Sequence, residues 1–276
     1  DLFGPERSAC AVLSYDYTVL AGTQGALGHR KKDRLFELIE RMRVPRRRVR
    51  PRLAEPLSEA EGMEVPIAGG SVMAWRLGSG PAVLLVHGWE DDNALWTPMI
   101  ERLVQDGRAV VAMDLPGHGF SQSEAAGFEP AAAAVRAVGE AAGPVEAVVA
   151  HSFGCAVTAL ALRGGLPATK AVLIAGNLPR RQGWYERARR HGVPDEVIAR
   201  VKELNGPMLD LEAILPEMTA EALYCHSIDD DQCAVEDVEL MASLWPGARL
   251  ALTDGLGHRL IAQDAAMVER IVDFLS

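Results

Sequence analysis

A serine between an apolar strand and an apolar helix is the first residue in this sequence that could do chemistry. Residues 150–154 read Ala-His-Ser-Phe-Gly and match the pattern G-x-S-x-G apart from Ala150 at its first position. A sharp strand-to-helix turn strains the serine and exposes its hydroxyl, and small flanking residues let the turn close. The N–H groups that begin the helix would face an oxyanion. The spacing therefore predicts Ser152 as a nucleophile.

A second turn could complete an oxyanion site. The segment His87-Gly88-Trp89 ends a continuous apolar strand, residues 82–87. A turn at this point would direct the N–H of Trp89 back toward Ser152, and the N–H of Phe153 would be the second donor. A His-Gly pair after a strand is equally consistent with an ordinary turn. Trp89 and Phe153 are therefore expectations for the oxyanion hole.

A third segment, together with those at residues 87–89 and 150–154, points to a known family. Residues 114–121 read Asp-Leu-Pro-Gly-His-Gly-Phe-Ser after the next strand. In this order and spacing, HGW, DLPGHGFS and HSFGC resemble the α/β-hydrolase fold family, with its esterase- and lipase-like serine hydrolases. The resemblance covers roughly residues 62–276. It implies that the third segment shapes the rim of the site, so Asp114 and His118 are expected to be scaffold residues.

The resemblance also implies the base that the serine needs. The family places its catalytic histidine in a G-x-G-H setting, which here is residues 255–258, just after an apolar strand. A histidine on a glycine-flanked loop can turn toward the serine. His258 is therefore the expected base.

The other histidines suit different roles. His151 adjoins the serine, but neighbours in a tight turn point apart, so it is expected to pack under the sheet. His226 lies within a strand and is expected in the core. His29 and His191 fall in basic helical stretches and are expected on the surface.

The orienting acid follows from the same resemblance. The strand at 222–227 leads into Ile228-Asp229-Asp230-Asp231, where the family usually has the pattern HGxxDxxVP. Aligning its first histidine with His226 implies Asp230 as the acid. The chain departs from this pattern at Ser227, Cys233 and Ala234, and a shift by one residue keeps Asp229 as the alternative. The family's other acid position, at 176–177, has no carboxylate here.

These residues need a parallel sheet to bring them together. Apolar segments predict strands at 63–67, 72–77, 82–87, 109–113, 145–150, 170–175, 222–227 and 248–253. Helical periodicity predicts helices at 94–105, 131–142, 153–163, 235–244 and 260–275. Continuous apolar strands suit a sheet that is covered on both faces. The sequence therefore predicts an α/β fold with a mostly parallel central sheet, helices on both faces and a functional edge at the carboxyl ends of the strands.

Two segments fall outside that alternation. Residues 1–60 are expected to form an N-terminal helical arm, and residues 61–276 the α/β-hydrolase core. Within the core, residues 178–219 stand where relatives carry a cap over the site. Apolar side chains that could line a substrate pocket, or belong to the core instead, are Trp89, Trp96, Phe153, Trp184, Met208 and Leu209.

Composition narrows the function classes. The 276 residues are 49% hydrophobic and carry a net charge of −10, which argues against general nucleic-acid binding. Residues 30–52 hold eleven basic and three acidic side chains. This stretch would contact an anionic partner, the chain's own acidic body, or a sister subunit in a homodimer. No apolar run approaches the length of a membrane span. Four cysteines without a CxxC pair and no evident secretory signal favour a cytoplasmic protein.

These expectations converge on one reaction. Ser152, Asp230 and His258 would form a triad that cleaves a carboxylic ester or thioester of a small-molecule acyl substrate through an acyl-enzyme. No HExxH, Walker or dinucleotide motif occurs in the required context, so no metal or cofactor is expected. The same triad could serve C–C bond hydrolysis, acyl transfer or perhydrolysis. A non-catalytic ligand-binding member of the fold is the remaining alternative.

Overall fold

The computed structural model describes residues 51–123, 125, 127–178, 189, 193–205 and 209–276. The chain divides into two compact units, one made of 1–43 and 180–208 and the other of 44–179 and 209–276. The second unit carries the sheet. The expected arm lies outside the described residues up to position 50, and so does much of the expected cap, including Trp184 and Met208.

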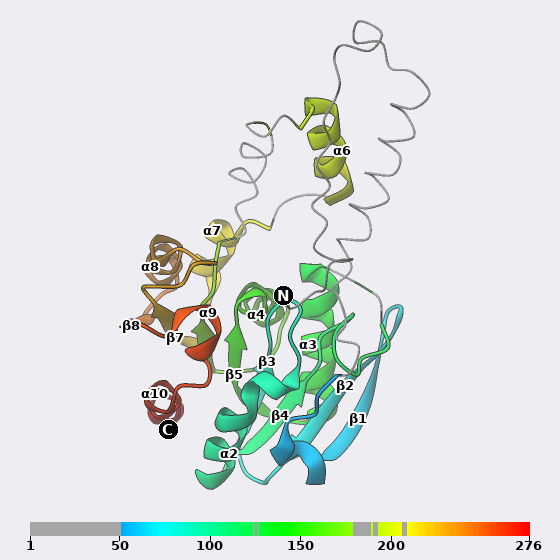
Figure 1. The fold of residues 1–276 in the computed structure, drawn as a ribbon. Helices are drawn as coiled ribbons and strands as arrows, with labels where there is room; N and C mark the ends of the chain where they lie inside the picture. Colours follow the sequence, from blue (N-terminus) through cyan, green and yellow to red (C-terminus); the bar gives the residue numbers. More distant parts are fainter. Residues whose placement is uncertain (1–50, 124, 126, 179–188, 190–192, 206–208) are drawn as a thin grey trace, which may run out of the picture. The chain divides into compact units, whose positions relative to one another are not determined.

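Eight strands form one sheet (Figure 1). They are β1 (Glu61–Ile67), β2 (Gly70–Leu77), β3 (Ala82–Val86), β4 (Ala109–Met113), β5 (Val145–His151), β6 (Lys170–Ile174), β7 (Glu221–Ser227) and β8 (Arg249–Thr253). Their order across the sheet is β1-β2-β4-β3-β5-β6-β7-β8. β2 pairs antiparallel with β1 and β4, and every pair from β4 to β8 is parallel. The predicted sheet is confirmed.

Helices connect the strands. They are α2 (Thr97–Gln105), α3 (Phe128–Ala142), α4 (Phe153–Arg163), α6 (Asp195–Asn205), α7 (Leu211–Ile214), α8 (Val235–Leu244), α9 (Gly257–Leu260) and α10 (Ala265–Leu275). Short 3₁₀ helices are η2 (Glu55–Glu59), η3 (Asn93–Trp96) and η4 (Leu215–Glu217). In the described residues, no helix is both long and apolar enough to cross a membrane.

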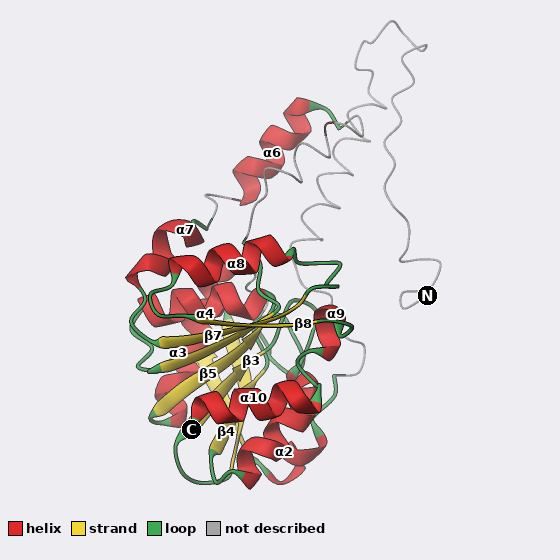
Figure 2. Ribbon diagram, turned by 90° about the vertical axis from the view of Figure 1, so that its left-hand side faces the viewer, coloured by secondary structure: helices red, strands yellow, loops and turns green. Residues whose placement is uncertain are grey.

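Two layers of helices bury the two faces of the sheet (Figure 2). Side chains of α3, α4, α7 and α8 pack on one face, and side chains of α2 and α10 pack on the other. The central strands β3 and β4 are buried at every position, because a side chain on either face of the sheet meets a helix. The sheet is therefore a rigid base, and the loops at the carboxyl ends of its strands carry the polar groups described below.

The C-terminal helix is shorter than the sequence predicts. The apolar periodicity extends from position 260, but α9 ends at Leu260 and α10 begins at Ala265. The side chain of Asp264 accepts a hydrogen bond of 2.9 Å from the N–H of Met267 and so caps α10. This break separates the short helix α9 from α10.

The approach of α4 to β3 depends on Gly154. A Cβ at this position would lie 2.6 Å from the carbonyl oxygen of Val86 and 2.7 Å from that of His87. Both obstacles are backbone atoms of a central strand and its end, which cannot turn aside as a side chain could. The glycine two positions after Ser152 is thus required for helix and strand to pack.

We therefore expect Gly154→Ala to lower the free energy of unfolding by about 1–3 kcal/mol, the usual cost of overpacking a core. Gly62→Ala is the matched control, because its Cβ would meet no atom closer than 3.7 Å, and its effect should stay within about 0.5 kcal/mol. Urea unfolding followed by circular dichroism measures both. Equal midpoints for the two variants would contradict this packing argument.

Candidate active site

Ser152 stands at the turn between β5 and α4 in a strained backbone conformation. Its φ is +51° and its ψ is −118°, a region that residues with a side chain rarely adopt. The turn is held on both sides. The N–H of Ser152 donates to the carbonyl of Ile174 on the neighbouring strand at 2.9 Å, and its carbonyl accepts from the N–H of Cys155 at 2.9 Å. The predicted strained turn is present, and it leaves the serine side chain partly exposed.

The structure brings the three predicted triad residues together. His258 Nε2 lies 3.0 Å from Ser152 Oγ, and His258 Nδ1 lies 2.7 Å from Asp230 Oδ2. A carboxylate accepts hydrogen bonds, so Nδ1 carries the proton and Nε2 is free to accept from the serine hydroxyl. The arrangement fixes the tautomer that a general base next to a serine requires.

Asp230 is held as a carboxylate. Burial raises its pKa, but hydrogen bonds from the ring of His258 and from two backbone N–H groups lower it, and the net pKa lies below the usual value. The backbone donors are Gln232 at 2.8 Å and Cys233 at 3.0 Å, both to Oδ1. An ionised Asp230 at neutral pH can stabilise a positive charge on His258.

Asp229, the alternative acid, points elsewhere. Its Oδ1 accepts from the N–H groups of Gly255 at 3.0 Å and Gly257 at 3.1 Å, and it also bonds the hydroxyl of Ser227. That hydroxyl oxygen in turn accepts from the N–H of Gly257 at 3.2 Å. Asp229 thus fixes the loop that leads into α9, while Asp230 faces the imidazole.

His151 contacts the histidine segment, a role that its sequence position did not indicate. It is buried as expected, but its Nε2 donates to the carbonyl oxygen of His258 at 2.8 Å, and the two rings are 4.9 Å apart. The expectation that His151 packs under the sheet is therefore wrong, because its ring contacts the segment that carries His258. Burial lowers the pKa of His151 to about 4, so the ring is neutral at pH 7.

An ion pair ties the same segment to the turn after β3. Arg259 directs both terminal nitrogens at the carboxylate of Asp91, with Nη2 2.9 Å from Oδ1 and Nη1 bonded to Oδ2. The Asp91 side chain is only 4% exposed, whereas that of Arg259 is 44% exposed. Bidentate pairs of this kind add geometric specificity. Neither residue was identified from sequence, because their partnership spans 168 positions.

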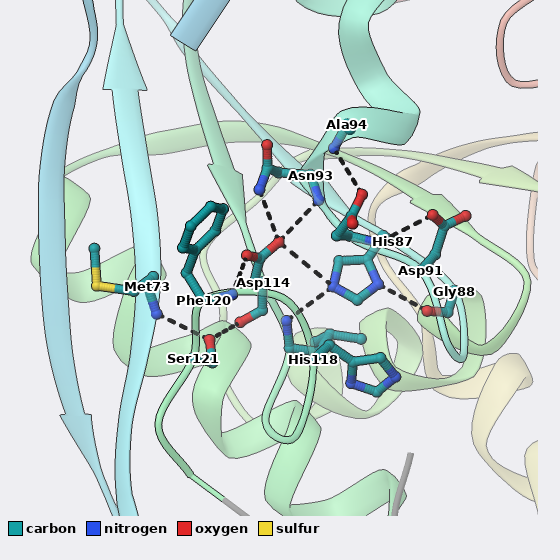
Figure 3. A network of polar contacts seen from close by, with 12 residues as sticks. Met73, His87, Gly88, Asp91, Asn93, Ala94, Asp114, His118, Phe120 and Ser121 are labelled. Carbon is teal, nitrogen blue, oxygen red and sulfur yellow. Dashed lines mark hydrogen bonds and ion pairs between the residues drawn. The ribbon is translucent and has the colours of Figure 1, made fainter. Parts of the chain in front are cut away.

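The turn at 87–90 lies directly against the nucleophile. A Cβ on Gly88 would come within 3.0 Å of the Cβ of Ser152. Two histidines hold the turn. His87 Nδ1 donates to the Gly88 carbonyl at 2.7 Å (Figure 3), and His118 Nε2 accepts from the N–H of Glu90 at 3.0 Å. Glu90 has a φ of +57°, so the turn is strained as well as anchored.

Asp114 lies beside the ring of His87, with its Oδ1 4.0 Å from His87 Nε2 (Figure 3). Its Oδ1 accepts from the N–H of Asn93 at 2.8 Å and from the amide Nδ2 of Asn93 at 3.0 Å. Its Oδ2 accepts from the N–H of Phe120 at 2.8 Å. These bonds connect loops to one another and do not reach the triad. This agrees with the expectation that Asp114 and His118 are scaffold residues.

Aromatic rings, one of them on the residue that follows Ser152, form a wall. Trp89 and Phe153 meet edge to face at 5.3 Å, and Phe128 stacks on Phe153 at 4.8 Å. Phe128, at the start of α3, was missed by sequence reasoning. Trp96 has no exposed surface and packs in the core, so it does not belong to this wall. Leu209 is half-buried against the core face of α3, α4, α7 and α8.

Three potential metal ligands lie within the site. Among the described residues, one oxygen of Asp230, the Sγ of Cys233 and a ring nitrogen of His258 all lie within 4.8 Å of one another. Burial, and to a lesser degree the carboxylates of Asp230 and Asp237, raise the pKa of Cys233 to about 12, so its thiol is protonated at pH 7.

Comparison with known proteins identifies a family. A model of the alpha/beta hydrolase family matches residues 83–267. Among solved structures, an esterase from Pyrococcus furiosus superposes with a TM-score of 0.68 at 19% identity, covering 84% of this chain and 98% of that one. An esterase from Exiguobacterium antarcticum gives a TM-score of 0.65 at 19% identity, covering 78% and 99%. At this identity the structural likeness supports the fold.

Curated relatives match only a short stretch. Pimeloyl-(acyl-carrier protein) methyl ester esterase of Xanthomonas oryzae pv. oryzae is 42% identical over 48 residues, which are 17% of this chain and 19% of that protein. The protein of the same name from Xylella fastidiosa is 37% identical over 46 residues. The chain thus matches about a fifth of the length of these relatives.

We expect His151 to make folding sensitive to acid. Its folded-state pKa of about 4 lies below the ordinary 6.5, so between these values the unfolded chain binds the proton more readily and stability falls with falling pH. Its contribution is fully present above pH 6.5. The Nδ1 atom has no hydrogen-bond partner among the described residues, so a proton there would be buried without an acceptor. The difference between the two pKa values corresponds to about 3 kcal/mol of folding free energy.

Unfolding of His151→Gln by urea at pH 4 to 8 measures this contribution. Glutamine keeps an N–H donor for the His258 carbonyl but does not titrate. The variant should therefore lose less stability than the wild type between pH 6.5 and 4, while above pH 7 the difference between the two should be constant. Parallel profiles over the whole range would show that His151 titrates normally.

Proposed function

Because this chain belongs to the alpha/beta hydrolase family, we propose that it is a serine hydrolase that cleaves a carboxylic ester or thioester through an acyl-enzyme intermediate. One observation supports this proposal more strongly than any other. Ser152, His258 and Asp230 form a continuous hydrogen-bonded series with spacings of 3.0 and 2.7 Å. A serine, a neutral imidazole and a carboxylate in this order are the groups that nucleophilic acyl transfer needs.

In the first half-reaction, Ser152 Oγ attacks the carbonyl carbon of the substrate while His258 Nε2 takes the hydroxyl proton. The tetrahedral intermediate then expels the alcohol or thiol, which receives that proton from Nε2. Asp230 keeps the ring in the productive tautomer and stabilises its charged form. The pKa of Asp230 lies below its usual value, so it can do so without taking the proton itself.

In the second half-reaction, water replaces the alcohol or thiol. His258 takes a proton from the water as its oxygen attacks the acyl carbon, and returns the proton to Ser152 Oγ when the acid leaves. The same imidazole therefore acts twice, once for each half-reaction. Its fixed position between Ser152 and Asp230 serves both.

The N–H groups of Trp89 and Phe153 are the proposed oxyanion donors. Phe153 is the first residue of α4, and the first N–H groups of a helix have no partner within it. Trp89 belongs to the turn that abuts Ser152 through Gly88. Because His87 and His118 fix that turn, its donors need little rearrangement when charge develops on the substrate oxygen.

The aromatic wall indicates an apolar substrate portion. Trp89, Phe153 and Phe128 are each partly exposed and contact one another in series beside the nucleophile. Such a surface suits a hydrocarbon acyl or alcohol group. The relatives named as methyl ester esterases and the structural neighbours named as esterases agree with an ester substrate.

Replacing the nucleophile should remove turnover. We expect Ser152→Ala to lower kcat for p-nitrophenyl ester hydrolysis by about 10⁴-fold or more, as loss of a triad serine does in other enzymes. The control is Ser243→Ala, an exposed serine on α8, which should keep wild-type kcat. Equal turnover by Ser152→Ala and wild type would exclude Ser152 as the nucleophile.

The two neighbouring aspartates should behave differently. Asp230→Asn removes the carboxylate that fixes the tautomer of His258, and we expect kcat to fall by about 10³- to 10⁴-fold. Asp229→Asn keeps an amide oxygen that can still accept from the loop N–H groups, so kcat should fall by less than about 10-fold, the equivalent of one lost neutral hydrogen bond. Steady-state ester hydrolysis distinguishes them. The reverse ranking would make Asp229 the acid.

A further inference from the structure

Cys233 lies beside the triad but has no part in the proposed reaction. It occupies one of the three positions where the chain departs from the family's sequence pattern after β7. Cys233 is only 4% exposed, and its backbone N–H donates a hydrogen bond to Asp230. Its Sγ lies within 4.8 Å of both an oxygen of Asp230 and a ring nitrogen of His258. The thiol therefore faces the same two groups that orient the catalytic proton.

The three donors match the ligands of one class of metal ion. Thiolate sulfur, imidazole nitrogen and carboxylate oxygen are the ligands of Zn²⁺, whereas Mg²⁺ and Ca²⁺ prefer oxygen alone. With metal–ligand bonds of about 2.0–2.3 Å, ligand atoms around one tetrahedral ion lie roughly 3–4 Å apart. Donor atoms that all lie within 4.8 Å need only small side-chain movements to reach that spacing.

Charge balance favours such an ion. The Asp230 side chain is completely buried and that of His258 is 10% exposed, so the charge of an ion bound here must be balanced by its ligands rather than by solvent. A divalent cation bound by one carboxylate, one thiolate and one neutral imidazole carries no net charge.

We propose that Asp230, Cys233 and His258 form an inhibitory binding site for a thiophilic divalent cation of the zinc class. The cation replaces the proton on Cys233 Sγ and the proton on His258 Nδ1, and both protons pass to the solvent. Asp230 Oδ2 then binds the cation in place of the Nδ1 proton. The imidazole can no longer become a cation held by Asp230, so proton transfer from Ser152 stops. This inhibition rests on the proposed function, whereas the binding does not.

The test uses the full chain, prepared without a polyhistidine tag and stripped of metal by a chelator. Cd²⁺ reports thiolate binding directly through the ultraviolet charge-transfer absorption of the Cd–S bond, and Zn²⁺ is titrated against p-nitrophenyl ester hydrolysis. We expect the wild type to show the absorption band and to be inhibited by Zn²⁺ but not by Mg²⁺. Cys233→Ala should lose the band and raise the Zn²⁺ inhibition constant at least about 10-fold, since even outer-shell changes at metal sites cost 10- to 100-fold in affinity.

Two further variants complete the design. Cys225→Ala removes another buried thiol, one that is not part of the donor group, and should retain both the band and the inhibition. Cys233→Ser preserves side-chain volume should the alanine variant fold poorly, and should behave like Cys233→Ala. The absence of a band in the wild type, or unchanged Zn²⁺ inhibition in both Cys233 variants, would overturn the proposal. If ester hydrolysis itself is absent, the Cd²⁺ absorption still tests the binding.

Discussion

The short helix α9 cannot hold His258 in place by itself. The site therefore depends on hydrogen bonds and an ion pair that other elements form with α9 and the loop before it. A helix of four residues is far below the length at which helices are stable alone. The groups that hold α9 and the loop before it are Ser227, Asp229, His151 and Asp91. They come from the carboxyl ends of β7, β5 and β3, all parallel strands of one buried sheet. The spacing between the imidazole and Ser152 is therefore set by groups at the carboxyl ends of the strands of this sheet.

The same edge of the sheet carries a second set of buried polar contacts, next to the turn at residues 87–90 that contacts Ser152. Asp114, Asn93 and His87 are all fully buried, and burying such groups without partners would cost several kcal/mol. Their hydrogen bonds run to the backbone of the surrounding loops; Asn93, for example, also accepts from the N–H of Ala54 at 2.8 Å. Satisfied networks of this kind rigidify what they contact. The strain at Ser152 and Glu90 persists because these contacts, and the packing of α4 on β3, determine the backbone on every side.

How much the sequence predicts depends on the range of the interaction. The strands follow from local apolar runs, and Ser152 follows from a short motif between a strand and a helix. Asp230 and His258 follow from the resemblance to the α/β-hydrolase fold family. The contacts of the segment that carries His258 with His151 and Asp91 do not follow from the sequence, because they join residues more than 100 positions apart. The choice between Asp229 and Asp230 also required coordinates, since adjacent residues in a loop point in different directions. Asp264 is a local signal for the start of a helix, but the apolar periodicity continues across it. The break between α9 and α10 was therefore missed by sequence reasoning.

The proposed mechanism transfers the acyl group of the substrate to Ser152 Oγ, so locating that group tests the mechanism without relying on a substitution. The wild-type chain is mixed with an activated ester, quenched in acid within its first turnovers, digested and analysed by peptide mass spectrometry. We expect one acylated peptide, with the added mass of the acyl group on Ser152. An acyl group on another side chain, or ester turnover with no acylated peptide at any quench time, would contradict it.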